Sequence, residues 1–164
     1  SGGRQRIIAG ILRVLASGAM SWKPEVDEIA RRRTRALEMG GAEALEKRAG
    51  RGLLNARERI TRLVDRDSFL ERGRIAGSSD ADGEDFTPTG VIVGTARIEG
   101  RPVVVCGDDF TIRGGAYSPA SIKKGLYAEE LAVERRMPLV RMLEAGGASI
   151  AGGTAGGSRG RTGY

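Results

Sequence analysis

The sequence of 164 residues contains no histidine and only one cysteine, Cys106. This scarcity excludes a Ser-His-Asp triad, a Cys-His pair, a zinc site of Cys and His ligands, and an internal disulfide bond. Acid–base or metal chemistry would therefore depend on carboxylates, lysine or tyrosine, unless backbone amides alone stabilise the reacting group. Cys106 lies in a run of valines, which favours a packed core thiol over a nucleophile.

Long apolar runs are also missing, because none approaches the ~20 residues that a membrane-spanning helix requires. We therefore expect a soluble protein without a membrane partner. Aromatic residues make up only 4% of the chain, and none interleaves with the arginines of residues 31–35. Since stacking on aromatic rings is typical of single-strand binding, no nucleic-acid partner is expected. Positive charge is plentiful: the net charge of +6 suits anionic ligands such as phosphates, or an acidic partner.

Residues 1–20 are interpreted as a basic leader or upstream extension outside the fold. They contain no acidic residue, and Ile8, Ile11 and Leu15 lie on one helical stripe. An organelle-targeting peptide or a membrane-surface helix has this pattern, but so can upstream sequence that precedes a start at Met20. We expect a cytoplasmic protein, or a mitochondrial-matrix one if residues 1–20 are a targeting peptide. The abundance of arginine over lysine favours a bacterial source.

Residues 21–72 are predicted to form an N-terminal helical segment. One helix should span residues 24–39, with Pro24 in its first turn. A second helix should begin after Asn55, whose side chain can cap it, and Glu58 completes a capping box. The buried stripe of this second helix would consist of Ile60, Leu63 and Val64.

Residues 73–164 are predicted to begin an α/β domain, after a polar, acidic loop at 73–88. Residues 91–98 and 102–106 are rich in β-branched side chains, and Glu99 and Gly100 between them fit a hairpin turn. A helix should follow from Ser118 as cap to about Arg136, with an apolar stripe of Ile122, Leu126 and Val133. A third strand at 138–143 would complete a parallel crossover.

Two glycine pairs, Gly114 with Gly115 and Gly146 with Gly147, follow the two strands of this crossover. Ligands bind beyond the carboxyl ends of parallel strands, and glycine there lets backbone N–H groups approach an oxyanion or phosphate. Alternatively, the pairs are turns whose glycines simply permit positive φ. The residues by themselves leave both interpretations open, and neither a P-loop nor a dinucleotide-binding fingerprint is present.

The blocks GRGLLNARERITRLVDRDSFLERG, GVIVGTARIEGRPVVVCGDDFTIRGGAYS and PLVRMLEAGGASI occur in this order within about residues 48–150. Together they resemble the N-terminal half of the carboxyltransferase (beta) subunit of biotin-dependent acyl-CoA carboxylases, the propionyl-, methylcrotonyl- and acetyl-CoA carboxylase family. The resemblance implies an α/β, crotonase-like (ClpP/crotonase) spiral of β-β-α units. Here the spiral would be incomplete, preceded by N-terminal helices and truncated at the C-terminus, as in a fragment of a longer protein.

The resemblance also implies a reaction, in which carboxybiotin on a partner carrier domain gives its carboxyl group to the α-carbon of an acyl-CoA. Backbone amides stabilise the enolate in that family, and no metal is expected on this segment. By position, the catalytic loop corresponds to Gly146, Gly147 and Ala148. The substrate-binding positions correspond to Gly114, Gly115, Ala116 and Lys123, and Lys123 and Lys124 could contact CoA phosphates or form an ordinary exposed helix face. The implied partners are a biotin carboxylase or biotin carrier subunit and further copies of the chain, with the active site between subunits.

Some positions depart from the family pattern. Glu144 and Ala145 replace the usual Asp-Ser, Ser149 replaces Arg, and Ala116 replaces Ser. These departures leave the acyl specificity and the activity open, so the alternative is a diverged, non-catalytic crotonase-like module that binds acyl-CoA or acts as a scaffold. Because the family's active site forms between the halves of two subunits, the 164 residues by themselves are expected to be inactive.

Overall fold

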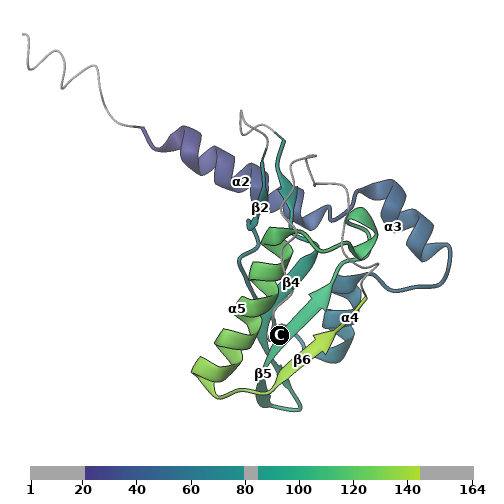
Figure 1. The fold of residues 1–164 in the computed structure, drawn as a ribbon, viewed down its shortest axis with the longest axis vertical. Coiled ribbons are helices and arrows are strands. Elements are labelled where there is room, and N and C mark those ends of the chain that lie inside the picture. The colour runs from purple at the N-terminus through teal and green to yellow at the C-terminus, as the bar shows by residue number, and fades with distance from the viewer. Residues whose placement is uncertain (1–20, 80–84, 145–164) are drawn as a thin grey trace, which may run out of the picture. The chain divides into compact units, whose positions relative to one another are not determined.

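The computed structural model in Figure 1 describes residues 21–79 and 85–144. The predicted leader, residues 1–20, lies outside this part. The chain divides into two units, residues 1–31 and 32–164. Helix α2 (Lys23–Leu37), which confirms the helix expected at 24–39, runs across this division, and its only buried residue is Ala36. In the described residues, no helix has the length and apolar character needed to span a membrane.

A four-stranded sheet in the order β1-β4-β5-β6 is the centre of the second unit. Strand β1 (Leu70–Arg72) pairs antiparallel with β4 (Val91–Ile98), which pairs antiparallel with β5 (Arg101–Asp108). Strand β6 (Leu139–Met142) pairs parallel with β5, and α5 (Pro119–Arg135) connects the two. The predicted hairpin and parallel crossover are therefore confirmed.

Helices cover both faces of this sheet, as Figure 1 shows for α4 and α5. Successive side chains of a strand point to opposite faces, and here both sets are apolar, as expected for a sheet buried on both sides. Helix α4 (Ala56–Leu63) packs through Ile60, and α5 packs through Ala128 and Leu131. The strand residues facing α4 are Ile92, Ala96, Val103 and Val105, and those facing α5 are Val91, Val93, Val104 and Cys106. Cys106 is thus the packed core thiol expected from its sequence context, and burial raises its pKa.

Two local predictions are confirmed at atomic detail. The side chain of Asn55 accepts a hydrogen bond from the Glu58 N–H (3.0 Å), and the Glu58 carboxylate accepts one from the Asn55 N–H (2.8 Å), which completes the capping box. Glu99 and Gly100 form a two-residue hairpin turn with φ values of 51° and 77°. The Asp65 carboxylate accepts hydrogen bonds from both turn N–H groups, at 2.8 Å each, which compensates for the left-handed conformation of Glu99.

Short elements differ from the sequence prediction. Helix α3 (Ala42–Ala49) was not expected. None of its residues is fully buried, and Leu45, which is partly buried against the core, gives too short a pattern to predict a helix. The segment expected to be a loop at 73–88 instead has short strands near its ends, β2 (Gly77–Ser78) and β3 (Thr87–Pro88), which pair antiparallel. Strands of two or three residues are too short to show the alternation by which strands are recognised.

The buried face of α5 also differs from the apolar stripe seen in the sequence. Ile122, Leu126 and Val133 are 52%, 52% and 80% exposed. The residues that face the sheet are instead Ser121, Lys124, Gly125, Ala128, Leu131 and Ala132. Most of these side chains are small, which lets the helix axis approach the strands closely, so size rather than hydrophobicity decides the orientation of this helix.

Candidate functional site

The carboxyl ends of β5 and β6 are joined by one buried carboxylate. Asp108, the last residue of β5, is 2% exposed. Its Oδ2 accepts hydrogen bonds from the Tyr117 hydroxyl (2.9 Å) and from the Glu144 backbone N–H (3.1 Å). Burial, together with the hydrogen bond to Asp108 and its negative charge, raises the pKa of Tyr117. Asp108 thereby ties the segment that leads into α5 to the segment that leaves β6.

The side chain of Glu144 is held by two arginines. Arg48 donates from Nη1 and Nη2 to the two carboxylate oxygens at 2.8 and 2.6 Å, and Arg59 lies 2.9 Å from Oε2. Arg59 also donates to the carbonyl oxygen of Asp108 at 2.7 Å, and Arg48 donates from Nε to the carbonyl oxygen of Leu54 at 2.7 Å. Bidentate arginine–carboxylate pairs are directional, so α3 and α4 together fix where the chain leaves β6.

A cleft of about 420 Å³ adjoins this ion-pair cluster. Its volume lies within the ~300–1,000 Å³ typical of small-molecule sites, and it is located beyond the carboxyl ends of parallel strands. It is lined by Ala44, Lys47, Arg48, Arg51, Leu53, Phe110, Thr111 and Glu144.

A second buried carboxylate supports one wall of the cleft. Asp109 is 1% exposed, and its Oδ1 accepts hydrogen bonds from the N–H (3.0 Å) and hydroxyl (2.6 Å) of Thr111. Burial raises the pKa of Asp109, and the two bonds from Thr111 oppose that rise. The Thr111 hydroxyl in turn accepts from the Gly40 N–H at 3.0 Å, which joins the cleft wall to the chain after α2.

Gly114, Gly115 and Ala116 lie in a tight turn before α5. Arg113, Gly114 and Gly115 have φ values of 51°, 63° and 71°, a run of left-handed residues for which glycine is well suited. The N–H groups of Gly115 and Ala116 donate to the carbonyl oxygens of Ile112 (3.0 Å) and Arg113 (3.2 Å). Two of the amides proposed for ligand binding are thus engaged inside the turn, and their substrate-binding role stays a prediction.

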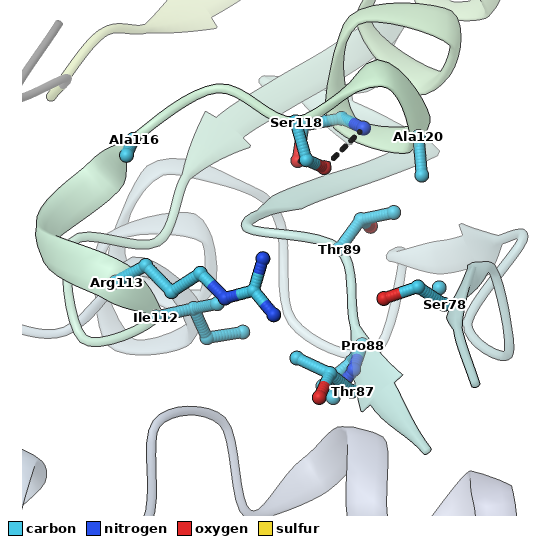
Figure 2. A pocket seen from close by; sticks show the side chains of 11 residues that line it. Ser78, Thr87, Pro88, Thr89, Ile112, Arg113, Ala116, Ser118 and Ala120 are labelled. Atoms are coloured by element: carbon cyan, nitrogen blue, oxygen red, sulfur yellow. Dashed lines mark hydrogen bonds between the residues drawn. The ribbon is translucent and has the colours of Figure 1, made fainter. Parts of the chain in front are cut away.

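Figure 2 shows a second hollow, between this turn and the β2–β3 pair. The side chain of Arg113 extends across it toward Thr89 and Ser78, and Ala116 lies at its border. The free volume is about 10 Å³, which is enough for roughly one water molecule. This hollow is therefore too small for a substrate.

The two lysines of α5 have different surroundings. Lys123 is exposed, whereas Lys124 is 7% exposed. Burial lowers the pKa of Lys124 to about 8, although the nearby Glu71 carboxylate acts in the opposite direction. The interpretation of Lys124 as part of an ordinary exposed helix face is therefore wrong. The predicted catalytic residues Gly146, Gly147 and Ala148 lie outside the described residues, and in the described part no cluster of carboxylates and cysteine could hold a metal ion.

The sequence prediction missed the residues that organise this site. They are Arg48, Arg59, Asp108 and Tyr117. A weak signal existed for one of them, because the adjacent acidic residues Asp108 and Asp109 follow a valine-rich strand, where a charged side chain requires a buried partner. No local signal identifies the arginine that holds Glu144, since Arg48 and Glu144 are 96 positions apart.

Comparisons with known proteins give a consistent result. Residues 47–161 match the family described as carboxyl transferase domain. The probable methylcrotonoyl-CoA carboxylase beta chain of Drosophila melanogaster is 39% identical over 115 residues, which are 70% of this chain and 20% of that protein. The propionyl-CoA carboxylase beta chain of Homo sapiens is 33% identical over 156 residues, 91% of this chain and 29% of that protein.

Solved structures are similar as well. Transcarboxylase 12S, with methylmalonyl-coenzyme A and methylmalonic acid bound, has a TM-score of 0.69 and 30% identity, covering 80% of this chain and 27% of that one. The geranyl-CoA carboxylase beta subunit of P. aeruginosa has a TM-score of 0.66 and 30% identity, covering 77% and 24%. These similarities confirm the α/β, crotonase-like fold. The chain spans only about a fifth to three tenths of the relatives it matches.

Proposed function

We propose that this chain, which belongs to the carboxyl transferase domain family, is part of the carboxyltransferase component of a biotin-dependent acyl-CoA carboxylase. In the proposed reaction the α-carbon of an acyl-CoA loses a proton to give the enolate, and a C–C bond forms between that carbon and the carboxyl carbon of carboxybiotin. The C–N bond of carboxybiotin breaks, and the proton ends on the biotin nitrogen that has released the carboxyl group. Carboxybiotin, delivered by a partner, supplies the activated carboxyl group. The task of the protein is to hold the thioester and to stabilise its enolate with preorganised donors.

The observation that carries this proposal is the anchoring of Glu144. Glu144 directly precedes Ala145, Gly146 and Gly147 in the sequence, where the resemblance puts the acyl-CoA loop. Its carboxylate is held by Arg48 and Arg59, and its N–H by Asp108. Glutamate instead of the usual aspartate is thus fully paired at this position. A chain that leaves β6 from a fixed point supports a working catalytic loop, because catalysis requires donors placed to within fractions of an ångström.

We further propose partners and location at the level the family suggests. The biotin would be carried by a biotin carboxylase or biotin carrier subunit, and further copies of the chain would complete the active site. The named relatives from Drosophila melanogaster and Homo sapiens are mitochondrial, while others are bacterial. The cytoplasm of a bacterium or the mitochondrial matrix are the corresponding locations for this protein.

A second candidate function is a diverged, non-catalytic acyl-CoA-binding or scaffold module. It is favoured by Ser149, which replaces an arginine of the family loop, and by Ala116, which replaces a serine. This candidate predicts saturable binding of an acyl-CoA without carboxyl transfer.

The test is an assay of the full-length protein with its biotin carboxylase and carrier partner, using labelled bicarbonate, ATP and a panel of acyl-CoA thioesters. We expect label in at least one acyl-CoA product, and no label when avidin blocks the biotin. Binding of an acyl-CoA with no transfer to any of the panel would contradict the enzymatic proposal and support the second candidate. The 164-residue chain by itself should not decarboxylate malonyl- or methylmalonyl-CoA, and measurable decarboxylation would overturn the need for a second half-site.

A further inference from the structure

The ends of strands β5 and β6 are connected by one side chain beyond the last residue pair of the sheet. The parallel pairing of these strands ends at Gly107 and Met142. Further along the chain, the Glu144 N–H donates to Oδ2 of Asp108 at 3.1 Å. This bond continues the connection after the strand pairing has stopped, so the direction in which the chain leaves β6 depends on the Asp108 side chain.

The same oxygen of Asp108 also holds Tyr117. The Tyr117 hydroxyl donates to Oδ2 at 2.9 Å. Tyr117 directly follows the glycine turn at residues 113–116, and the next residue, Ser118, caps α5 by accepting from the Ser121 N–H at 3.1 Å. Because the start of the helix is already capped, the Tyr117 bond is not needed to begin α5. It instead ties the glycine turn to the end of β6 through a single carboxylate.

The surroundings of Asp108 make these two bonds strong and well defined. Asp108 is 2% exposed, and hydrogen bonds to a charged acceptor in a buried site are stronger than those in water. The Arg59 guanidinium donates to the carbonyl oxygen of Asp108 at 2.7 Å and lies 2.9 Å from Oε2 of Glu144, so the backbone around the carboxylate is fixed as well. Groups that stabilise a reacting centre must be held to within about 0.5 Å, which requires supports of this kind.

We propose that Asp108 and Tyr117 are positioning residues of the site, which hold the glycine turn at residues 113–116 and the exit from β6 at a fixed separation. From Glu144 the chain continues into residues 146–148, which are proposed to face the acyl group. Neither side chain needs to contact the substrate, because each acts through the backbone next to the groups that it holds. The inference rests on the proposed function, and it adds residues that were not among those predicted from the resemblance.

The experiment compares Tyr117→Phe with Tyr127→Phe in the full-length protein, assayed for carboxyl transfer with its biotin carboxylase and carrier partner. Both substitutions remove one hydroxyl, but Tyr127 lies further along α5 and is 40% exposed. Because Tyr117→Phe removes one of the two bonds to Oδ2 of Asp108, we expect kcat to fall about three- to tenfold, with less than about a twofold change in KM for the acyl-CoA. Tyr127→Phe should leave both values unchanged. The free energy of unfolding is measured for each variant, because a purely structural role would lower it and leave kcat of the folded protein unchanged.

Substitutions of Asp108 provide the second test. Asp108→Asn keeps a carbonyl oxygen that can accept from both Tyr117 and Glu144, whereas Asp108→Ala removes the acceptor. We therefore expect Asp108→Asn to retain more of kcat than Asp108→Ala. In the Asp108→Ala background, Tyr117→Phe should cause no further loss of kcat, because the acceptor of its hydroxyl is already gone. Where Asp108→Ala does not fold, the two tyrosine variants decide the inference.

An unchanged kcat in Tyr117→Phe, an equal loss in Tyr127→Phe, or a rise in KM alone would overturn the inference, while carboxyl transfer by the wild type would still uphold the proposed function. If the wild type transfers no carboxyl group to any acyl-CoA, amide hydrogen exchange of residues 144–148 in the full-length protein tests the inference separately. Faster exchange in Tyr117→Phe than in Tyr127→Phe would uphold the support of this segment by Tyr117, and equal exchange would overturn it.

Discussion

Helix α4 holds two glutamates through two arginines that are two positions apart, and the two ion pairs differ in exposure. Arg57 contacts Glu71 on β1 at 2.9 and 3.0 Å, and Arg74 adds a further contact at 2.7 Å. Arg59 contacts Glu144 beyond β6, together with Arg48. Glu71 lies on the edge strand β1 and Glu144 lies just beyond the opposite edge strand β6, so one helix fastens both edges of the sheet.

The two clusters differ in exposure, which indicates that the Glu71 cluster stabilises the fold and the Glu144 cluster belongs to the site. The side chain of Glu71 is 3% exposed, whereas that of Glu144 is 27% exposed and lines the cleft. Burial would by itself raise the pKa of Glu71, but the hydrogen bonds and charges of Arg57 and Arg74 outweigh it and lower the pKa. An arginine–glutamate ion pair thus stabilises the fold where it is buried, as at Glu71, and remains accessible to a ligand where it borders a cleft, as at Glu144.

The largest effect is expected from Glu71→Ala, which leaves two arginines and the buried Lys124 without their carboxylate. Removing one partner of a buried ion pair costs about 3–5 kcal/mol, and because Arg57 and Arg74 are partly exposed we expect about 3 kcal/mol. The measurement is denaturant unfolding of the full-length protein at pH 7. Glu134→Ala is the matched control, because the Glu134–Arg135 pair is largely exposed and should contribute less than about 0.5 kcal/mol.

Equal losses for Glu71→Ala and Glu134→Ala would show that the enclosed cluster has no special role. Acid provides an independent check. Because the pKa of Glu71 is lowered on folding, its contribution is present above the ordinary value of 4.5 and is lost as the pH falls through the lower folded value. The free energy of unfolding should therefore decrease less on acidification below pH 4.5 in Glu71→Ala than in the wild type.

Lys124 interacts electrostatically with the enclosed cluster of Glu71, Arg57 and Arg74, and burial lowers its pKa on folding from 10.5 to about 8. Between these values the folded state has released the proton and the unfolded state retains it, so the free energy of unfolding rises with pH across this window. The rise attributable to Lys124 should be roughly 2–3 kcal/mol. The groups that act on it are Glu71, Arg57, Arg74 and Cys106.

Lys124→Met removes this titration. The free energy of unfolding is measured at pH 7 and pH 10 for both proteins, and the value of the variant is subtracted from that of the wild type. The contribution of Cys106, which is present in both proteins, cancels in this difference. Lys123→Met, at the exposed neighbouring position, should leave the wild-type rise intact. A wild-type minus Lys124→Met difference that stays constant from pH 7 to pH 10 would contradict the burial of a charged amine.

The smallest loss of stability, and the largest loss of activity, is expected from a substitution of Glu144 in the partly exposed cluster that it forms with Arg48 and Arg59. Glu144→Gln retains hydrogen-bonding atoms but removes the charge shared by Arg48 and Arg59, so we expect about 1 kcal/mol of lost stability. We call the contacts of Arg48 and Arg59 with Glu144 the clamp. If the clamp positions the segment that follows Glu144, kcat for carboxyl transfer by the full-length protein should fall about tenfold or more, because small displacements of catalytic groups are costly. Glu144→Asp, which restores the carboxylate, should recover most of kcat. Unchanged kcat in Glu144→Gln would remove Glu144 from the positioning role.

Local signals explain which parts of the fold could be predicted. The capping box of Asn55 and Glu58 and the turn at Glu99 and Gly100 depend on residues within three positions of one another, so the sequence displays them directly. The buried face of α5 could not be predicted from such local signals. Its apolar stripe is conspicuous in the sequence, but Gly125, Ala128 and Ala132 control the approach to the sheet, and that depends on the volume of the partner strands.

The site was predicted only in part for the same reason. The position of the site at the carboxyl ends of β5 and β6 followed from the predicted crossover, whereas the pairing of Glu144 with Arg48 and Arg59 did not. That clamp brings together α3, α4 and the end of β6, and its arginines resemble the many exposed arginines of this basic chain. The cleft was missed with it, because α3 itself was not predicted.

The Asp65-capped turn has a consequence for the order of folding. The β4–β5 hairpin pairs over eight positions through contacts that are close in sequence, and Asp65 attaches its turn to the end of α4. Hairpins form in about 1–10 μs, whereas contacts between distant segments wait for loop closure. We therefore expect the hairpin and α4 to form the folding nucleus, and the Arg48–Glu144 clamp to close last. During synthesis, a nascent chain could shield its valine-rich strands before the residues that complete the site have left the ribosome.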